Sequence, residues 1–220
     1  MLQPLSRKAI FRASSFADTF IAEMQQSYAQ DFDLSDAQDC SMLRKYYDHL
    51  KPFRYVDPPL SNGMLVLTFP ADDRKEYFAQ MPVAMVQLLE ALGSTQLYFV
   101  DFLKTRLNEF PFETYRKRNQ LKRLLGWSLK YGGFRLSITD LPVVWPLFYF
   151  SGIYARTAIV LISDGEAPLA LRLCRDGNFH CHYQEVHQQR IATAAQDVGF
   201  LVGDIDLCWQ YRIDSLPAGA

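Results

Sequence analysis

Two Asp-Gly pairs, Asp164-Gly165 and Asp176-Gly177, divide the segment 157–186 into three runs of strand-forming residues. Asp-Gly is favoured in tight hairpin turns, because glycine adopts a positive φ without steric cost. Strands joined by such turns must run antiparallel. The pattern therefore predicts a three-stranded antiparallel meander, and it constrains the fold more than any other feature of the chain.

The first run, 157–163, is apolar on both faces, which is typical of a strand covered on both sides. We expect it in the middle of a sheet, with the segments 169–174 and 179–186 as the strands that follow. A two-residue turn at Asp176-Gly177 would pair Leu173 with His180 and Leu171 with His182. In that register the histidines share a face with leucines, and Gly177 has a positive φ.

Helical periodicity dominates the first half of the chain. Apolar residues recur at helical spacing in 14–30, and a capping box, Ser35-Asp36-Ala37-Gln38, predicts a second helix starting at Ser35. Further on, the pattern predicts a strand at 64–69, a helix from Pro82 to Gly93, helices at 112–125 and 187–196, and strands at 134–139 and 207–213. The segment 96–102 fits either a strand or a helix, and 141–162 reads as two buried strands.

These elements predict an α+β fold, with helices mainly N-terminal and an antiparallel β-meander or sheet mainly C-terminal. We expect one domain over residues 1–220. The turn-rich stretch near 57–63 is a possible sub-boundary between a helical segment, 1–56, and a mixed body, 64–220.

Composition predicts a cytoplasmic protein. The N-terminus has no continuous apolar region of the kind found in secretory signals, and 141–162 contains prolines, a glycine and Arg156, which disfavour a membrane span. The four cysteines lack CxxC spacing, so free thiols in a reducing compartment are expected. A net charge of -1 offers no general attraction to nucleic acid.

A histidine cluster in the third strand is one candidate site. His180 and His182 stand two residues apart, so both point to the same face of a strand, a spacing that can bring two imidazoles onto one metal ion. His187 is the third candidate ligand. Nearby residues that could complete a site for a divalent transition metal such as zinc are Glu185, Cys174, Asp204 and Asp206.

A basic segment, 104–135, is the other candidate. It holds nine Lys or Arg residues against two Glu, in a chain whose net charge is -1. Its aromatic and arginine residues are types that often carry binding energy at protein interfaces, and a partner with an acidic surface would be attracted to them. The residues predicted to bind such a partner are Tyr115, Arg116, Arg118, Arg123 and Trp127.

Motifs for common enzyme classes are missing: the sequence has no P-loop, GxGxxG, GxSxG or HExxH. We therefore expect a non-enzymatic protein-binding protein without a cofactor, of the adaptor or inhibitor type that includes immunity proteins. One alternative is a metal-dependent enzyme using His180 and His182. A second is a nucleic-acid-binding protein using the basic segment 104–135.

Overall fold

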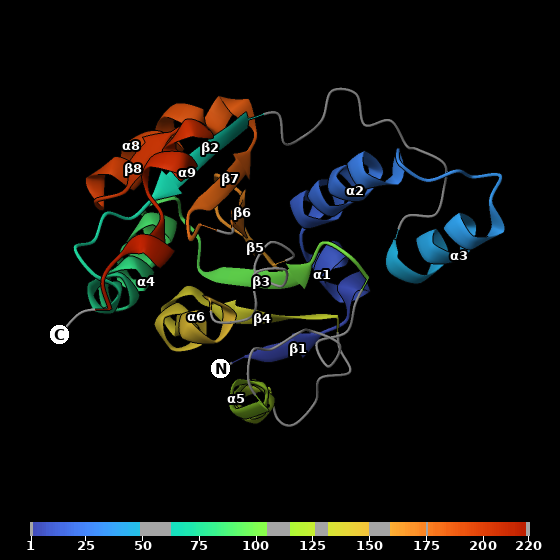
Figure 1. Cartoon of the computed structure of the whole chain (residues 1–220), viewed down its shortest axis with the longest axis horizontal. Coiled ribbons are helices and arrows are strands. Elements are labelled where there is room, and N and C mark those ends of the chain that lie inside the picture. Colours follow the sequence, from blue (N-terminus) through green and yellow to red (C-terminus); the bar gives the residue numbers. More distant parts are fainter. Residues whose placement is uncertain are drawn as a thin grey trace.

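An antiparallel sheet of eight strands forms the centre of the computed structural model, which describes residues 2–48, 63–104, 115–125, 132–149, 159–174 and 176–218. The strand order is β1-β4-β3-β5-β6-β7-β2-β8 (Figure 1). The strands are β1 (Gln3–Leu5), β2 (Gly63–Thr68), β3 (Gln96–Asp101), β4 (Gly133–Ser137), β5 (Ile159–Ser163), β6 (Leu169–Leu173), β7 (Phe179–Tyr183) and β8 (Leu201–Gly203). Helices lie mainly in the N-terminal half and strands largely in the C-terminal half, so the predicted α+β class is confirmed.

Helices cover both faces of this sheet. The larger core lies between one face and α4 (Arg74–Ala91), α5 (Tyr115–Leu124), α6 (Leu141–Tyr149) and α8 (Gln188–Asp197). On the opposite face, α1 (Arg7–Ala13) and α2 (Ser15–Ala29) pack over strands β3 to β6. The short helix α9 (Asp206–Gln210) contacts β2 and β8, and α3 (Ala37–Tyr46) follows α2 at the periphery (Figure 1).

The predicted central strand is confirmed. β5 lies between β3 and β6 in the sheet. Alternate residues bury on opposite faces: Leu161 belongs to the larger core, whereas Val160 and Ile162 pack under α1 and α2. An apolar run without alternation is what a strand needs when both of its faces are covered. In the segment 96–102, which the sequence left undecided, Gln96–Asp101 form strand β3.

The predicted register of the second hairpin is wrong by one residue. Leu173 pairs with Phe179 and Arg172 pairs with His180. The turn is longer than two residues, because the Cys174 N–H donates to Asn178 O at 2.8 Å, and three positions separate these two residues in the sequence. Gly177 has φ 92°, as predicted, since a three-residue hairpin loop places glycine in the left-handed region at its last position. The histidines therefore share their face with Arg172 and Ala170 instead of leucines.

Two segments predicted as strands are helices. Residues 141–149 form α6, whose Val144, Trp145 and Leu147 are buried, while 150–158 lie outside the described residues. A short apolar run does not separate a buried helix from a buried strand by periodicity, and Pro142, near the start of the helix, is compatible with its first turn. Residues 206–210 form α9, so the predicted strand at 207–213 is also wrong.

Two helices begin at residues other than those predicted. The second helix is capped by Asp36, not Ser35, and its carboxylate accepts from the N–H groups of Gln38 and Asp39. Helix α4 begins at Arg74, because the Asp73 side chain caps it, and Pro82 lies inside the helix. A good N-cap thus outweighed the proline as a start signal. Gly93 ends this helix with φ 76°, as predicted.

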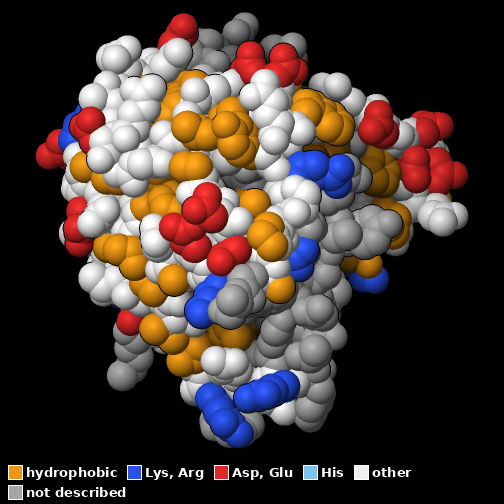
Figure 2. Space-filling view, turned by 60° about the vertical axis from the view of Figure 1, so that its left-hand side comes forward, with side chains coloured by type: hydrophobic (Ala, Val, Ile, Leu, Met, Phe, Trp, Pro, Cys, Tyr) orange, Lys and Arg blue, Asp and Glu red, His pale blue; other side chains and the backbone are white. Residues whose placement is uncertain are grey.

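Basic side chains mark the outer face of α5. Arg116, Gln120 and Arg123 are exposed, whereas Leu121 and Leu125 are buried in the larger core. Figure 2 shows Lys and Arg side chains gathered at the lower end of the molecule, the level at which Figure 1 places α5. The helix is amphipathic, with its charge turned to solvent.

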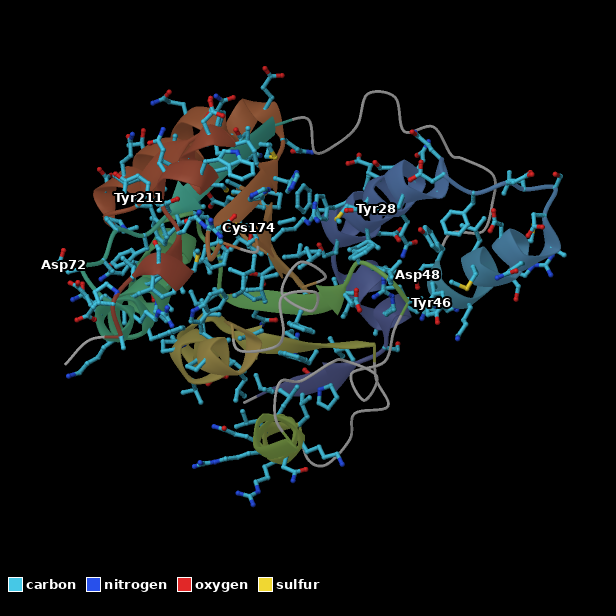
Figure 3. The ribbon with its side chains drawn as sticks, viewed as in Figure 1. Tyr28, Tyr46, Asp48, Asp72, Cys174 and Tyr211 are labelled. Carbon is cyan, nitrogen blue, oxygen red and sulfur yellow. The ribbon has the colours of Figure 1, made fainter. Side chains whose placement is uncertain are left out.

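A buried ion pair joins α1 and α2 to the chain that follows α3. The Arg7 Nε donates to Asp48 Oδ2 at 2.9 Å, and both side chains are largely buried, with exposed fractions of 7% and 13%. Gln25 on α2 donates to the same carboxylate and to Phe102 O, and Arg7 also donates to Asp101 O. In Figure 3, Asp48 lies among α1, α2 and α3, near Tyr28 and Tyr46. The network connects this corner of the molecule to the end of β3.

No helix in the described ranges is long and apolar enough to cross a membrane. The possible sub-boundary near 57–63 lies almost wholly outside the described residues, so the division of the chain into one or two domains stays a prediction.

Candidate functional site

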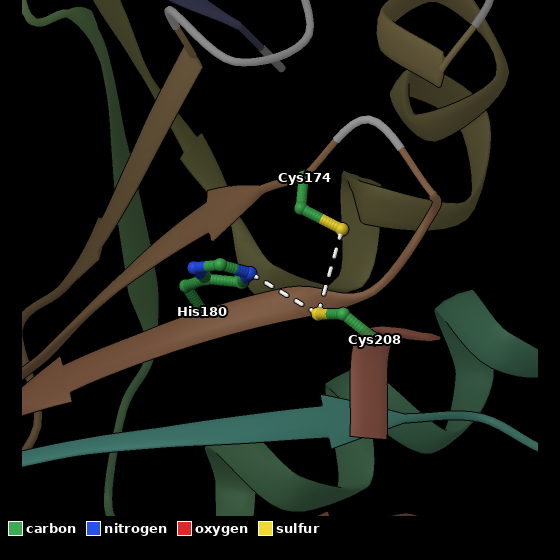
Figure 4. A group of neighbouring side chains, drawn as sticks. All are labelled: Cys174, His180 and Cys208. Carbon is green, nitrogen blue, oxygen red and sulfur yellow. Dashed lines mark hydrogen bonds between the residues drawn. The ribbon is translucent and has the colours of Figure 1, made fainter. Parts of the chain in front are cut away.

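Three potential metal ligands converge near the turn between β6 and β7. Cys174 follows β6, His180 lies on β7, and Cys208 lies on α9. The two Sγ atoms are 3.9 Å apart, and His180 Nε2 is 3.2 Å from Cys208 Sγ (Figure 4). All three donor atoms lie within 4.8 Å of one another. We refer to Cys174, His180 and Cys208 as the Cys-His cluster.

Local structure explains how α9 delivers its cysteine. The hairpin turn holds the segment after α9, because Asn178 Nδ2 donates to Tyr211 O and the Ile213 N–H donates to Asp176 O. Asp176 also forms an ion pair with Arg212 at 3.0 Å. These contacts pin the end of α9 to the hairpin, so that Cys208 faces His180.

Burial sets the protonation of this cluster. Removal from water lowers the pKa of His180, and the positive charge of Arg172 lowers it further. Burial, assisted by the neighbouring Cys174, raises the pKa of Cys208 to about 12. At neutral pH the pair is a thiol beside an uncharged imidazole. A thiolate–imidazolium pair of the kind used in nucleophilic catalysis is therefore disfavoured.

The three predicted histidine ligands are separated. His180 and His182 share one face of β7, as expected, but only His180 belongs to the cluster. The His182 ring packs on Phe20 of α2, with centroids 5.1 Å apart. His187 and Glu185 lie on the 3-10 turn Glu185–His187, after β7 has ended.

Two other predicted ligands, Asp204 and Asp206, do not have the expected alternating geometry, because their segment is not a strand. Asp204 and Asp206 are exposed, and Asp204 Oδ1 accepts from the Asp206 N–H at 3.0 Å next to the start of α9. The sequence did not single out Cys208 as a ligand. It stands 34 residues from Cys174. Only the position of its helix, α9, next to β7 could have identified Cys208 as a ligand.

Cys181 is not part of the site. It is fully buried in the larger core, on the face of β7 opposite His180, and burial raises the pKa of its thiol. Cys181 and the two histidines thus point to opposite faces of the strand, as alternate residues of a strand do.

The predicted partner-binding residues are only partly described. Arg116 and Arg123 are exposed on α5, as predicted. Tyr115 and Arg118 lie on the same helix, but their side chains are outside the described residues, and so is Trp127. The surface defined by Arg116 and Arg123 therefore stays a prediction as a binding site.

A separate pocket of about 370 Å³ opens beside the segment that follows α9. Its walls include Asp72, Glu76, Tyr211 and Arg212, and Figure 3 shows Asp72 and Tyr211 on the side of the molecule away from α3. None of the cluster residues lines it, so pocket and cluster are distinct features that share the hairpin contacts of residues 211–213.

Comparisons with protein-family models, with curated proteins and with solved structures give no match for this chain, so the proposals that follow rest on its own geometry.

Proposed function

We propose that this protein is a metal-dependent enzyme, in which Cys174, His180 and Cys208 bind a divalent transition metal of the zinc type. The observation that carries the proposal is the convergence of three donor atoms from three separate parts of the chain within 4.8 Å. Thiolate sulfur and imidazole nitrogen are the ligands that zinc prefers.

Two of the three donor separations are close to those of such a site. Tetrahedral zinc, with Zn–S bonds near 2.3 Å and Zn–N bonds near 2.0 Å, separates two sulfurs by about 3.8 Å and a sulfur from a nitrogen by about 3.6 Å. The Cys174–Cys208 separation of 3.9 Å matches the first value, and the His180–Cys208 separation of 3.2 Å needs a shift of a few tenths of an ångström. The two thiols are free in this structure, since their sulfurs are 3.9 Å apart and a disulfide bond is about 2.05 Å long.

The cluster becomes negatively charged when it binds a metal, and this charge offsets the nearby positive charge of Arg172. The two thiols lose their protons when a metal binds, and the metal supplies the positive charge that a buried thiolate otherwise lacks. His180 needs no deprotonation, because its pKa is already lowered. Three protein ligands leave a fourth tetrahedral position, and sites of this kind, unlike closed four-ligand structural sites, hold water or substrate.

Metal analysis tests the proposal. Protein loaded with Zn²⁺ and freed of excess metal is expected to retain about one equivalent per chain, and Co²⁺ loading is expected to produce a thiolate charge-transfer band, since two ligands are sulfur. Cys208→Ser, which leaves Cys174 as the one sulfur ligand, should weaken the band and lower the affinity at least tenfold. Cys40→Ser is the matched control, because Cys40 lies on α3 outside the cluster. Wild-type protein that releases its metal as readily as Cys208→Ser would overturn the assignment.

A second candidate function is binding of a protein partner with an acidic surface, as the sequence predicts. The observation that favours it is the exposure of Arg116 and Arg123 on the same helix whose leucines are buried, so that the charge is presented on a rigid support. Opposite charge would steer the partner, and the association rate would fall as salt rises.

Charge reversal separates this candidate from a plain solvated helix. Arg116→Glu combined with Arg123→Glu should leave the melting temperature within about 2 °C, because exposed substitutions change stability little. Copurification from the native host should then lose a protein that the parent retains at low salt. Arg190→Glu, on exposed helix α8, is the control for a general change in charge. If the double variant keeps every partner, α5 is not the binding surface.

A further inference from the structure

An arginine without a partner lies beside the Cys-His cluster. Arg172 is on β6, directly across from His180 on β7, and its side chain shares the face of the sheet that carries the cluster. Its Nε is buried and forms no hydrogen bond within the part of the chain that the structure describes. The ion pairs found there join Arg7, Arg190 and Arg212 to carboxylates, but none joins Arg172.

A second orphaned polar atom stands next to it. The Nε2 atom of His182 is also buried without a hydrogen-bond partner among the described residues. His182 is opposite Ala170, the residue of β6 that precedes Arg172 by two positions on the same face. The register thus places Arg172 opposite His180 and diagonally across from His182, and the charge of Arg172 acts on both imidazoles.

Two elements enclose this group from above the sheet. Phe20 of α2 packs on His182, and Cys208 of α9 contacts His180. Strand β6, which carries Arg172, lies between α2 on one side and α9 on the other (Figure 1).

Leaving such groups unpaired is costly. A buried polar atom without a hydrogen bond costs about 1–3 kcal/mol. Arg172 is half-buried, but its Nε is buried and unpaired. An unpaired Nε on a cationic side chain, beside an unpaired imidazole nitrogen, is what a ligand supplying negatively charged oxygens would satisfy.

We propose that Arg172 and His182 bind a compact oxyanion, a carboxylate or phosphate group, beside the Cys-His cluster. The planar guanidinium offers donors spaced for two oxygens of such a group, and His182 adds a third polar contact. The binding site itself needs no metal. The site also implies a substrate class, namely a small molecule that carries a carboxylate or phosphate and reaches the metal with its other end. This implication rests on the proposed function.

The test uses chelator-treated, metal-free protein. Its melting temperature is measured in rising sodium phosphate and, separately, sodium acetate, each at the ionic strength of a sodium chloride reference. We expect a saturable rise over chloride with at least one of the two anions, because a ligand that binds only the folded state stabilises it. A rise with phosphate alone assigns the site to phosphate groups, and a rise with acetate assigns it to carboxylates.

Arg172→Met identifies the site. This variant removes the charge together with the buried, unpaired Nε and keeps the length of the side chain, so it should melt at or above the parent in chloride and gain nothing from either anion. Arg190→Met, at an exposed ion pair on α8, should keep the parent's response. His182→Phe, which retains the packing on Phe20, should raise the half-saturating anion concentration at least tenfold. This variant tests the site if Arg172→Met fails to fold.

Two results would overturn the proposal: wild-type protein that responds to phosphate and acetate no more than to chloride, or an Arg172→Met variant that responds like the parent. Zinc retention measured on the same preparations reports separately on the Cys-His cluster. A protein that binds phosphate but not zinc would contradict the proposed metal site and support the oxyanion site. A protein that binds zinc but neither phosphate nor acetate would contradict the oxyanion site and support the metal site.

Discussion

Replacing Arg7 with alanine is expected to destabilise the protein by about 3–5 kcal/mol, because it leaves the Asp48 carboxylate buried without its cation. Arg7 Nη2 is 2.7 Å from Asp48 Oδ2, and the same carboxylate accepts from Gln25. The truncation therefore breaks a network that joins α1, α2 and β3 at once. Denaturant unfolding measures the loss as a fall in the midpoint at an unchanged slope.

The matched control is Arg12→Ala, on the same helix. Arg12 is exposed, and its truncation should change the free energy of unfolding by no more than about 0.5 kcal/mol. A double variant, Arg7→Met with Asp48→Leu, should recover much of the stability, since removing both charges leaves neither unpaired. If Arg7→Ala is as stable as Arg12→Ala, the ion pair does not hold this corner together.

Replacing Gly177 with valine is expected to cost about 1–3 kcal/mol, because a β-branched residue is strained at the φ of 92° found there. Gly177→Asn should cost less, since asparagine tolerates the left-handed region. Thermal unfolding compares the two. The hairpin also positions Cys174 and His180, so Gly177→Val should weaken zinc retention as well. Equal melting of the valine and asparagine variants would contradict the backbone explanation.

The central meander could be predicted because its signals are local. An apolar run and two Asp-Gly pairs are enough to order β5, β6 and β7, and the positive φ of Gly177 follows from the same turn chemistry. The register between β6 and β7 could not be predicted from these local signals. Two- and three-residue loops both accept glycine near the turn, yet they differ by one residue and so change which side chains face the histidines.

The site depended on contacts that no local pattern reports. His180 was identified from its spacing to His182, but its actual neighbours are Cys174, at the end of the preceding strand, and Cys208 on α9. The segment 207–213 reads as a strand from composition, whereas its packing on β2 and β8 makes part of it a helix. Tertiary packing determined the secondary structure of this segment, as it did for α6, a helix that is apolar on all sides.

Both borders of the sheet are short and poor templates for further strands. β1 and β8 each have three residues, and β1 contains Pro4, which has no N–H to offer a neighbouring chain. Long unpaired borders invite copies of a protein to join edge to edge, and brief or proline-bearing ones resist this. Concentrated solutions of the folded protein should therefore resist stacking into extended β-ribbons. A peptide ligand would have to be recognised through side chains rather than as an added ninth strand.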